Sequence, residues 1–291
     1  MNTAALPSLF VSHGSPMIAL EPGATGAFLR RLGPAIDAAF TRPRAVLAVS
    51  AHTAARAPVL LAAPRHEAVH DFGGFPDALY RLRYDAPGAP ALAARAQALL
   101  AAVGVDASVL PEGGLDHGIW TALRHVYPDA DVPVLPLALV TSMSTARLFA
   151  LGEALAPLAA DGVLVLGTGS ITHNLRLVSA HRPRAAADRH AADTAGDGDA
   201  EMPESRAFRD WFAERSAALD WPALFDWRRR APHAALMHPT DEHLLPWFPA
   251  AGAGGRQALP LRLHQGATLG CLGMDAYAFG DGAATLAAAL R

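Results

Sequence analysis

Short apolar runs alternate along the chain with longer stretches in which apolar residues recur every three to four positions. The runs are continuous rather than interrupted by polar residues, which is typical of strands that are covered on both faces. We therefore predict buried strands at residues 9–11, 45–50, 134–140 and 163–166.

The stretches between these runs have helical periodicity. They predict helices at residues 25–40, 89–103, 119–126, 145–159 and 205–219. A shorter helix is expected at 241–248, with Thr240 as its N-cap. Near the end of the chain, residues 261–264 and 268–279 are expected to pair as a hairpin that turns at Gln265 and Gly266.

This alternation of strands and helices predicts an α/β fold. We expect one domain over residues 1–291, with a mixed, largely parallel sheet and helices on both faces. Residues 182–204 are polar and simple in composition, so they are expected to form a mobile loop within this domain.

Composition narrows the possible functions. Of the 291 residues, 52% are hydrophobic and 18% are charged, which is enough for a large core. The net charge of −3 argues against a nucleic-acid-binding protein, which usually carries a basic surface. Cys271 is the single cysteine, so a CxxC zinc site and an iron–sulfur cluster are excluded. All 24 basic residues are arginine, which excludes a Schiff-base lysine and a P-loop lysine.

The hydropathy pattern does not suggest a membrane protein. No window approaches the roughly 18 uninterrupted apolar residues of a membrane span, and the first residues lack the features of a signal peptide. We expect a cytoplasmic protein.

Thirteen histidines are present, and their positions relative to the predicted strands single out two of them. His13 and His52 each follow the carboxyl end of a predicted strand. Ligands of open α/β sheets bind beyond the carboxyl ends of the strands, so these two imidazoles are able to converge. Because imidazole is the commonest side-chain metal ligand, the pair predicts an open metal site.

Three further histidines have contexts that suit the same crevice. His173 follows the fourth strand through a glycine turn, and His117 lies among glycines just before a helix. His243 lies at the start of the predicted short helix, and Glu242 beside it is a second candidate ligand. Asp116 is expected either to orient a neighbouring imidazole or to cap the following helix.

Other chemistries find little support in the sequence. The chain has neither the GxSxG elbow of a serine hydrolase nor an HExxH zinc motif. The segment 70–76, rich in aromatic residues and glycine, suits a pocket wall. The histidines without a strand-end or glycine context are expected to be solvated or structural: His66, His125, His181, His190, His233, His238 and His264.

Six short motifs occur in one order along the chain. They are HGSP at 13–16, SAH at 50–52, HDFGGFP at 70–76, LDHG at 115–118, THN at 172–174 and EHLLP at 242–246. With this ordered set the chain resembles the DOPA dioxygenase-type members of the class III extradiol ring-cleavage dioxygenases, which are relatives of the protocatechuate 4,5-dioxygenase catalytic subunit. The resemblance covers about residues 7 to 278.

The resemblance implies a function and a set of site residues. It implies one α/β domain with a non-haem metal, expected to be Fe(II), although Zn(II) could be the ion found in the purified protein. The partners would be a small aromatic diol and O2, and the ring would open to a semialdehyde. Carried onto this sequence, it makes His13, His52 and His243 metal ligands, His173 a further ligand or an acid/base, and His117 a contact to substrate or oxygen. The side chains of Phe72, Phe75 and Trp120 are then expected to line the ring pocket.

Two alternatives use the same histidines: a zinc-dependent hydrolase with a bound water, and a non-enzymatic metal-binding protein. The sequence leaves open which catechol is the substrate, which metal is native, whether Glu242 contributes, and the oligomeric state.

Overall fold

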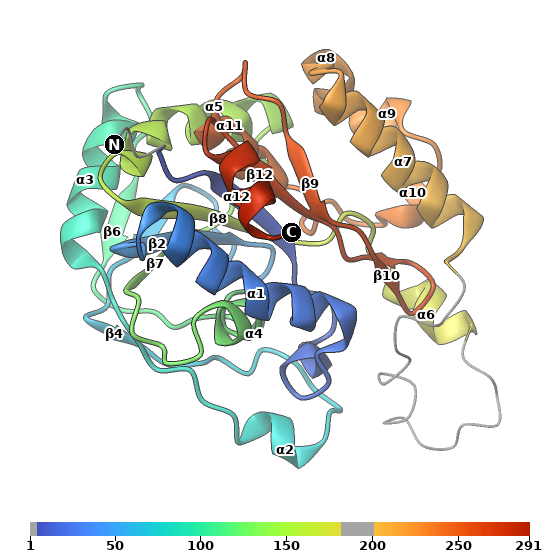
Figure 1. The fold of residues 1–291 in the computed structure, drawn as a ribbon, viewed down its shortest axis with the longest axis horizontal. Coiled ribbons are helices and arrows are strands. Elements are labelled where there is room, and N and C mark those ends of the chain that lie inside the picture. Colours follow the sequence, from blue (N-terminus) through green and yellow to red (C-terminus); the bar gives the residue numbers. More distant parts are fainter. Residues whose placement is uncertain (1–4, 182–200) are drawn as a thin grey trace.

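A computed structural model describes residues 5–181 and 201–291, and a six-stranded sheet forms its centre (Figure 1). The strand order is β7-β2-β8-β1-β12-β9. Strands β7, β2, β8 and β1 run parallel, and β12 and β9 continue the sheet antiparallel beyond β1. The bounds are β1 Ser8–Ser12, β2 Ala45–Ser50, β7 Val134–Pro136, β8 Val163–Gly169, β9 Leu261–His264 and β12 Ala276–Phe279. The predicted α/β fold with a mixed, largely parallel sheet is confirmed.

The sheet is covered on both faces, which explains the continuous apolar runs. In β2, Val46 and Ala48 belong to one hydrophobic core, whereas Leu47 and Val49 belong to the other. Because successive side chains of a strand point to opposite faces, a strand between two cores needs apolar residues at every position.

Helices form the two outer layers. One core contains side chains of α1 Gly23–Phe40, α4 His117–Val126 and α12 Ala283–Ala289. The other contains those of α3 Pro90–Ala101, α5 Thr145–Leu155, α11 Trp247–Gly254 and α7 Pro203–Ala217. Helix α7 lies beside the sheet together with α8 Trp221–Phe225, α9 Trp227–Arg230 and α10 Ala234–Met237 (Figure 1). None of the described helices combines the length and apolarity needed to cross a membrane.

Several smaller elements have no counterpart among the predictions. They are the helices α2 Asp77–Tyr80 and α6 Leu175–His181, the 3-10 helix Pro16–Ala19, and the strands β3 Val59–Leu61, β4 Arg65–His66, β5 Ala86–Pro87 and β6 Ser108–Leu110. The 3-10 helix Ala156–Ala159 is the end of the helix predicted at 145–159, and the short strands β10 Ala267–Thr268 and β11 Leu272–Gly273 fall at the start of and within the strand predicted at 268–279.

Three predicted elements differ in the structure. Residues 241–246 form turns, and the helix begins only at Trp247, because Pro246 has no N–H to donate to a preceding carbonyl. The strand predicted at 134–140 ends at Pro136, and Leu137 and Leu139 form only isolated bridges.

The predicted hairpin is interrupted. Leu269 and Gly270 have left-handed φ values of 52° and 72° and make a turn that separates β10 from β11. Therefore only β12 pairs with β9. Most of the expected loop, residues 182–200, lies outside the described residues, and Pro203 and Glu204 already belong to α7.

Candidate metal centre

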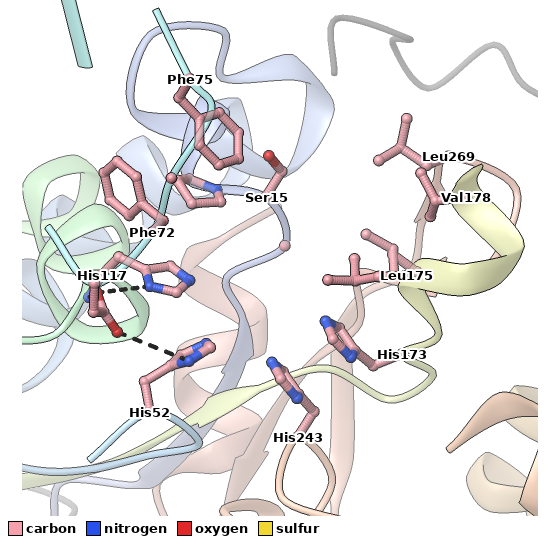
Figure 2. Close-up of a pocket in the computed structure, with 15 residues that line it drawn as sticks. Ser15, His52, Phe72, Phe75, His117, His173, Leu175, Val178, His243 and Leu269 are labelled. Carbon is pink, nitrogen blue, oxygen red and sulfur yellow. Dashed lines mark hydrogen bonds and ion pairs between the residues drawn. The ribbon is translucent and has the colours of Figure 1, made fainter. Parts of the chain in front are cut away.

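The parallel strands deliver three histidines to one edge of the sheet. The register pairs Ser12 with Gly169 and Ser50 with Thr168, so β1, β2 and β8 end side by side. His13, His52 and His173 follow these three ends and point toward one crevice, as Figure 2 shows for His52 and His173.

Two more histidines reach the crevice from outside the sheet. His243 lies in the turn before α11, and its backbone carbonyl accepts a hydrogen bond from Ser170 N at 2.8 Å. His117 is the first residue of α4. Asp116 caps this helix through the backbone N–H of Ile119 and also accepts hydrogen bonds from Ser50 and Thr53. Of the two roles expected for Asp116, the structure supports the helix cap.

His13, His52 and His243 offer three nitrogen atoms that lie within 4.8 Å of one another. The Nε2 atoms of His13 and His52 are 3.1 Å apart. Two imidazoles that bind one metal at about 2.1 Å have nitrogen atoms about 3.0–3.4 Å apart in octahedral or tetrahedral geometry. The spacing therefore fits two ligands of one divalent metal ion, and the residues present fit such an ion.

Hydrogen bonds fix which nitrogen of His13 is free. Its Nδ1 lies 2.9 Å from the hydroxyl of Thr168. That hydroxyl donates its only hydrogen to the carbonyl of Gly118, at 2.8 Å, so it must accept from His13. Nε2 of His13 is then unprotonated and faces His52, as a metal ligand requires.

Glu242 likewise determines which nitrogen of His243 carries the hydrogen. Its carboxylate lies 3.2 Å from His243 Nδ1, and this hydrogen bond lowers the pKa of Glu242 to about 2. An ionised carboxylate can only accept, so Nδ1 of His243 carries the hydrogen and Nε2 is free. Glu242 is not a member of the three-residue group and is placed to orient one of its members.

Burial keeps several of these imidazoles neutral. Burial, and then the neighbouring histidines, lower the pKa of His13 well below its usual value and that of His52 to about 3. Burial and His243 lower the pKa of His173 to about 2. At neutral pH these rings hold unprotonated nitrogen atoms, which is the state that binds metals.

His117 is paired with Asp71, whose role was missed in the sequence. One Asp71 oxygen accepts hydrogen bonds from His117 Nδ1 at 2.9 Å and from the His117 backbone N–H at 3.0 Å. Burial raises the pKa of Asp71, but these hydrogen bonds outweigh burial and lower it overall. The other oxygen lies 3.9 Å from His52 Nδ1. The only sequence signal for this role is an acid inside the segment 70–76, for which the composition predicts a pocket wall.

His173 lies apart from the three-nitrogen group. Its ring stacks on that of His243, with centroids 3.4 Å apart and an interplanar angle of 8°. Although it lines the same cavity, it is not among the three residues whose nitrogen atoms converge. This position suits contact with a bound molecule better than coordination.

A cavity of about 450 Å³ opens above the histidines (Figure 2). Phe72 and Phe75 line it as predicted, with their rings edge to face at 5.3 Å. Trp120 does not line it: its indole is fully buried and donates to the carbonyl of Val69. The full lining is Gly14, Ser15, Pro16, His52, Asp71, Phe72, Gly73, Phe75, His117, His173, Leu175, Val178, His243, Leu269 and Leu272.

Most of the remaining histidines have structural partners. Four of them donate to backbone carbonyl groups: His66 to Gly113, His70 to Leu82, His125 to Ile18 and His238 to Ile171. His264 contacts Thr25 and stacks on Phe28. His233 is exposed, and His190 lies outside the described residues.

Comparisons with known proteins identify relatives of this chain. Residues 7–274 match the family described as the catalytic LigB subunit of aromatic ring-opening dioxygenase. A 4,5-DOPA dioxygenase extradiol of Escherichia coli is 34% identical, and the match covers 94% of this chain and 94% of that protein. A 4,5-DOPA dioxygenase extradiol of Beta vulgaris is 32% identical, and the match covers 94% of this chain and 96% of that protein. The crystal structure of the uncharacterised protein JW3007 from Escherichia coli K12 superposes with a TM-score of 0.73 at 27% identity, covering 94% of this chain and 100% of that chain.

Proposed function

Because this chain belongs to the family of catalytic LigB subunits of aromatic ring-opening dioxygenases, we propose that it uses Fe(II) held by His13, His52 and His243 to open a catechol ring with O2. As a ring-opening dioxygenase the protein is an oxidoreductase. Family membership therefore argues against the zinc-dependent hydrolase and the non-enzymatic metal-binding protein.

The observation that carries the metal proposal is the convergence of three imidazoles whose partners free a nitrogen for coordination. Thr168 fixes the tautomer of His13, and Glu242 fixes that of His243. When bound, Fe(II) supplies open coordination positions for the diol and the electron transfer that lets O2 react with an aromatic ring. Three neutral ligands leave the ion its full positive charge, which favours a bound diol in its ionised form.

His173 is proposed as the acid/base of the reaction. Burial and the neighbouring His243 lower the pKa of His173, so its imidazole is unprotonated at neutral pH and offers a ring nitrogen to a diol hydroxyl. The same nitrogen would return the proton to an oxygen atom later in the reaction. Its place over His243 puts the ring beside the metal-binding group.

His117 is proposed to hold an oxygen of the substrate. Its Nδ1 hydrogen is directed to Asp71, so Nε2 is left as an acceptor for a diol hydroxyl. The rings of Phe72 and His117 are nearly perpendicular with their centroids 5.6 Å apart, and an aromatic substrate ring would lie against Phe72.

The test is iron content and oxygen uptake in matched variants. The protein is loaded with Fe(II) without oxygen, and uptake with catechol is followed together with the absorbance of a yellow semialdehyde. His52→Ala is expected to retain less than about a tenth of the wild-type iron, because losing one of three ligands removes much of the binding energy. The control is His233→Asn, which removes an exposed imidazole and should leave the iron content unchanged. Asparagine tolerates the left-handed backbone that His233 adopts. Full iron content in His52→Ala would refute the ligand assignment.

A cytoplasmic location and the absence of nucleic-acid and membrane partners remain predictions of the sequence.

A further inference from the structure

The cavity has an aliphatic side that the proposed chemistry does not use. Leu175 and Val178 extend from α6. Leu269 lies in the turn between β10 and β11, and Leu272 is the first residue of β11. We call these four residues the aliphatic wall. Figure 2 shows Leu175, Val178 and Leu269 beyond His173, on the side of the cavity away from His117 and Phe72.

Packing holds three of the four wall residues in place, and Leu175 lies at the exposed end of the wall. Val178 and Leu272 are buried and, with the buried Cys271, form a small hydrophobic cluster separate from the two main cores. Leu269 is partly buried and packs on the same cluster. Leu175 and Val178 are three positions apart in α6, so their side chains lie on one face of the helix. A molecule that enters the cavity therefore meets a preformed apolar surface.

Two carboxylates lie close to the histidines. Asp71 lines the cavity on the side opposite the wall, and the carboxylate of Glu242 lies 3.2 Å from His243 Nδ1. No arginine occurs among the lining residues of the described part of the chain, and the whole sequence has no lysine. An anionic group on the wall would lose its hydration without gaining a charged partner from these residues.

We propose that the substrate is a catechol with an uncharged, apolar ring substituent, an alkyl or aryl group, which packs on the aliphatic wall while the diol faces the histidines. This rests on the proposed ring-opening function. The E. coli and beet relatives are named for DOPA, whose side chain carries an ammonium and a carboxylate group. The substituent expected for this chain's substrate carries neither charge.

Matched substrates test the inference. Oxygen uptake by the Fe(II)-loaded protein is measured with catechol, 4-methylcatechol, 4-propylcatechol, 3-(3,4-dihydroxyphenyl)propanoate and L-DOPA. Each methylene buried on the wall is expected to raise kcat/KM about fourfold, which is the factor given by ~0.8 kcal/mol per CH2. The propyl compound should exceed the methyl compound roughly 15-fold by the same factor. We expect it to exceed the propanoate at least about tenfold, because the carboxylate would be desolvated.

Variants of the wall locate the contact. Leu175 is 58% exposed, so replacing it does not create a cavity in a core. Leu175→Arg should raise the ratio of propanoate to propylcatechol turnover at least about tenfold through a new charge-assisted contact. The control Leu175→Gln introduces a polar but uncharged side chain. It should lower the turnover of propylcatechol without raising the turnover of the propanoate. Isothermal titration calorimetry of the Zn(II)-loaded variants with both compounds should give the same order of affinities without turnover.

The outcomes separate the two proposals. If the iron-loaded protein opens no catechol at all, the proposed function fails. If catechol is opened but the propanoate or L-DOPA is preferred, only the apolar-substituent inference is overturned. A propylcatechol preference that Leu175→Arg leaves unchanged would also overturn it, because the substituent would then lie elsewhere.

Discussion

At the scale of single residues, the decisive features are the groups that hold each imidazole. Asp71 bonds both the backbone and the ring of His117, and its second oxygen faces His52. We predict that Asp71→Asn keeps its iron but lowers kcat per bound iron about 10- to 100-fold, the usual effect of removing such a partner. Asparagine has a similar shape, but it no longer enforces one tautomer of His117. Oxygen uptake normalised to iron content measures the effect.

The matched control for this variant is Asp77→Asn, which replaces an exposed acid six positions further along the chain, at the start of α2. It changes the net charge equally and should leave turnover per iron at the wild-type level. If Asp71→Asn also turns over normally per iron, Asp71 has no positioning role.

At the scale of elements, the close approach of β8 to the turn that carries His243 sets the geometry of the site. A Cβ added at Gly169 would lie 2.0 Å from the carbonyl oxygen of His243. Because that atom is backbone, Gly169→Ala must displace the turn and His243 with it. We predict a loss of about 1–3 kcal/mol in stability, as overpacking typically causes, together with reduced iron content.

Thermal unfolding and metal analysis measure both effects. Gly73→Ala is the matched control, since an added Cβ there meets nothing within 4 Å. It should keep both the wild-type melting temperature and the wild-type iron content. Wild-type iron content in Gly169→Ala would show that the turn does not determine metal binding.

At the scale of the whole molecule, buried neutral histidines link stability to pH. His238 is fully buried against Phe208 and Trp227, and burial lowers its pKa to about 3. The unfolded chain takes up this proton near pH 6.5, whereas the folded protein does not, so stability is complete above pH 6.5 and falls as the pH drops toward 3. Each buried neutral histidine of this kind lowers the free energy of unfolding by about 1.4 kcal/mol for every pH unit in that range.

Urea unfolding of the metal-free protein between pH 7 and 5 tests this prediction. The His238→Gln variant should be less stable at pH 7 than the wild type. Its free energy of unfolding should fall less steeply as the pH drops, and the two slopes should differ by about 1.4 kcal/mol per pH unit. Parallel stability curves for the two proteins would contradict the assignment.

Local patterns in the sequence were sufficient to predict the central strands and the type of chemistry. Runs such as 45–50 are apolar at every position because both faces of the strand are covered, so local composition already reports that environment. His13 and His52 follow strands directly, and parallel strands present their carboxyl ends together, so their convergence could be predicted without coordinates. The order of the six motifs likewise indicated the family that the comparisons confirm.

The partners of each imidazole and the surroundings of the cavity depend on contacts between distant parts of the chain. The hydroxyl that fixes the tautomer of His13 belongs to Thr168, 155 positions away. The pairing of Asp71 with His117 and the stacking of His173 on His243 also join distant segments. The aliphatic wall combines α6 with a turn nearly a hundred residues later. Such contacts depend on how elements pack across the whole chain, and hydrophobic periodicity, which is a local signal, carries no information about them.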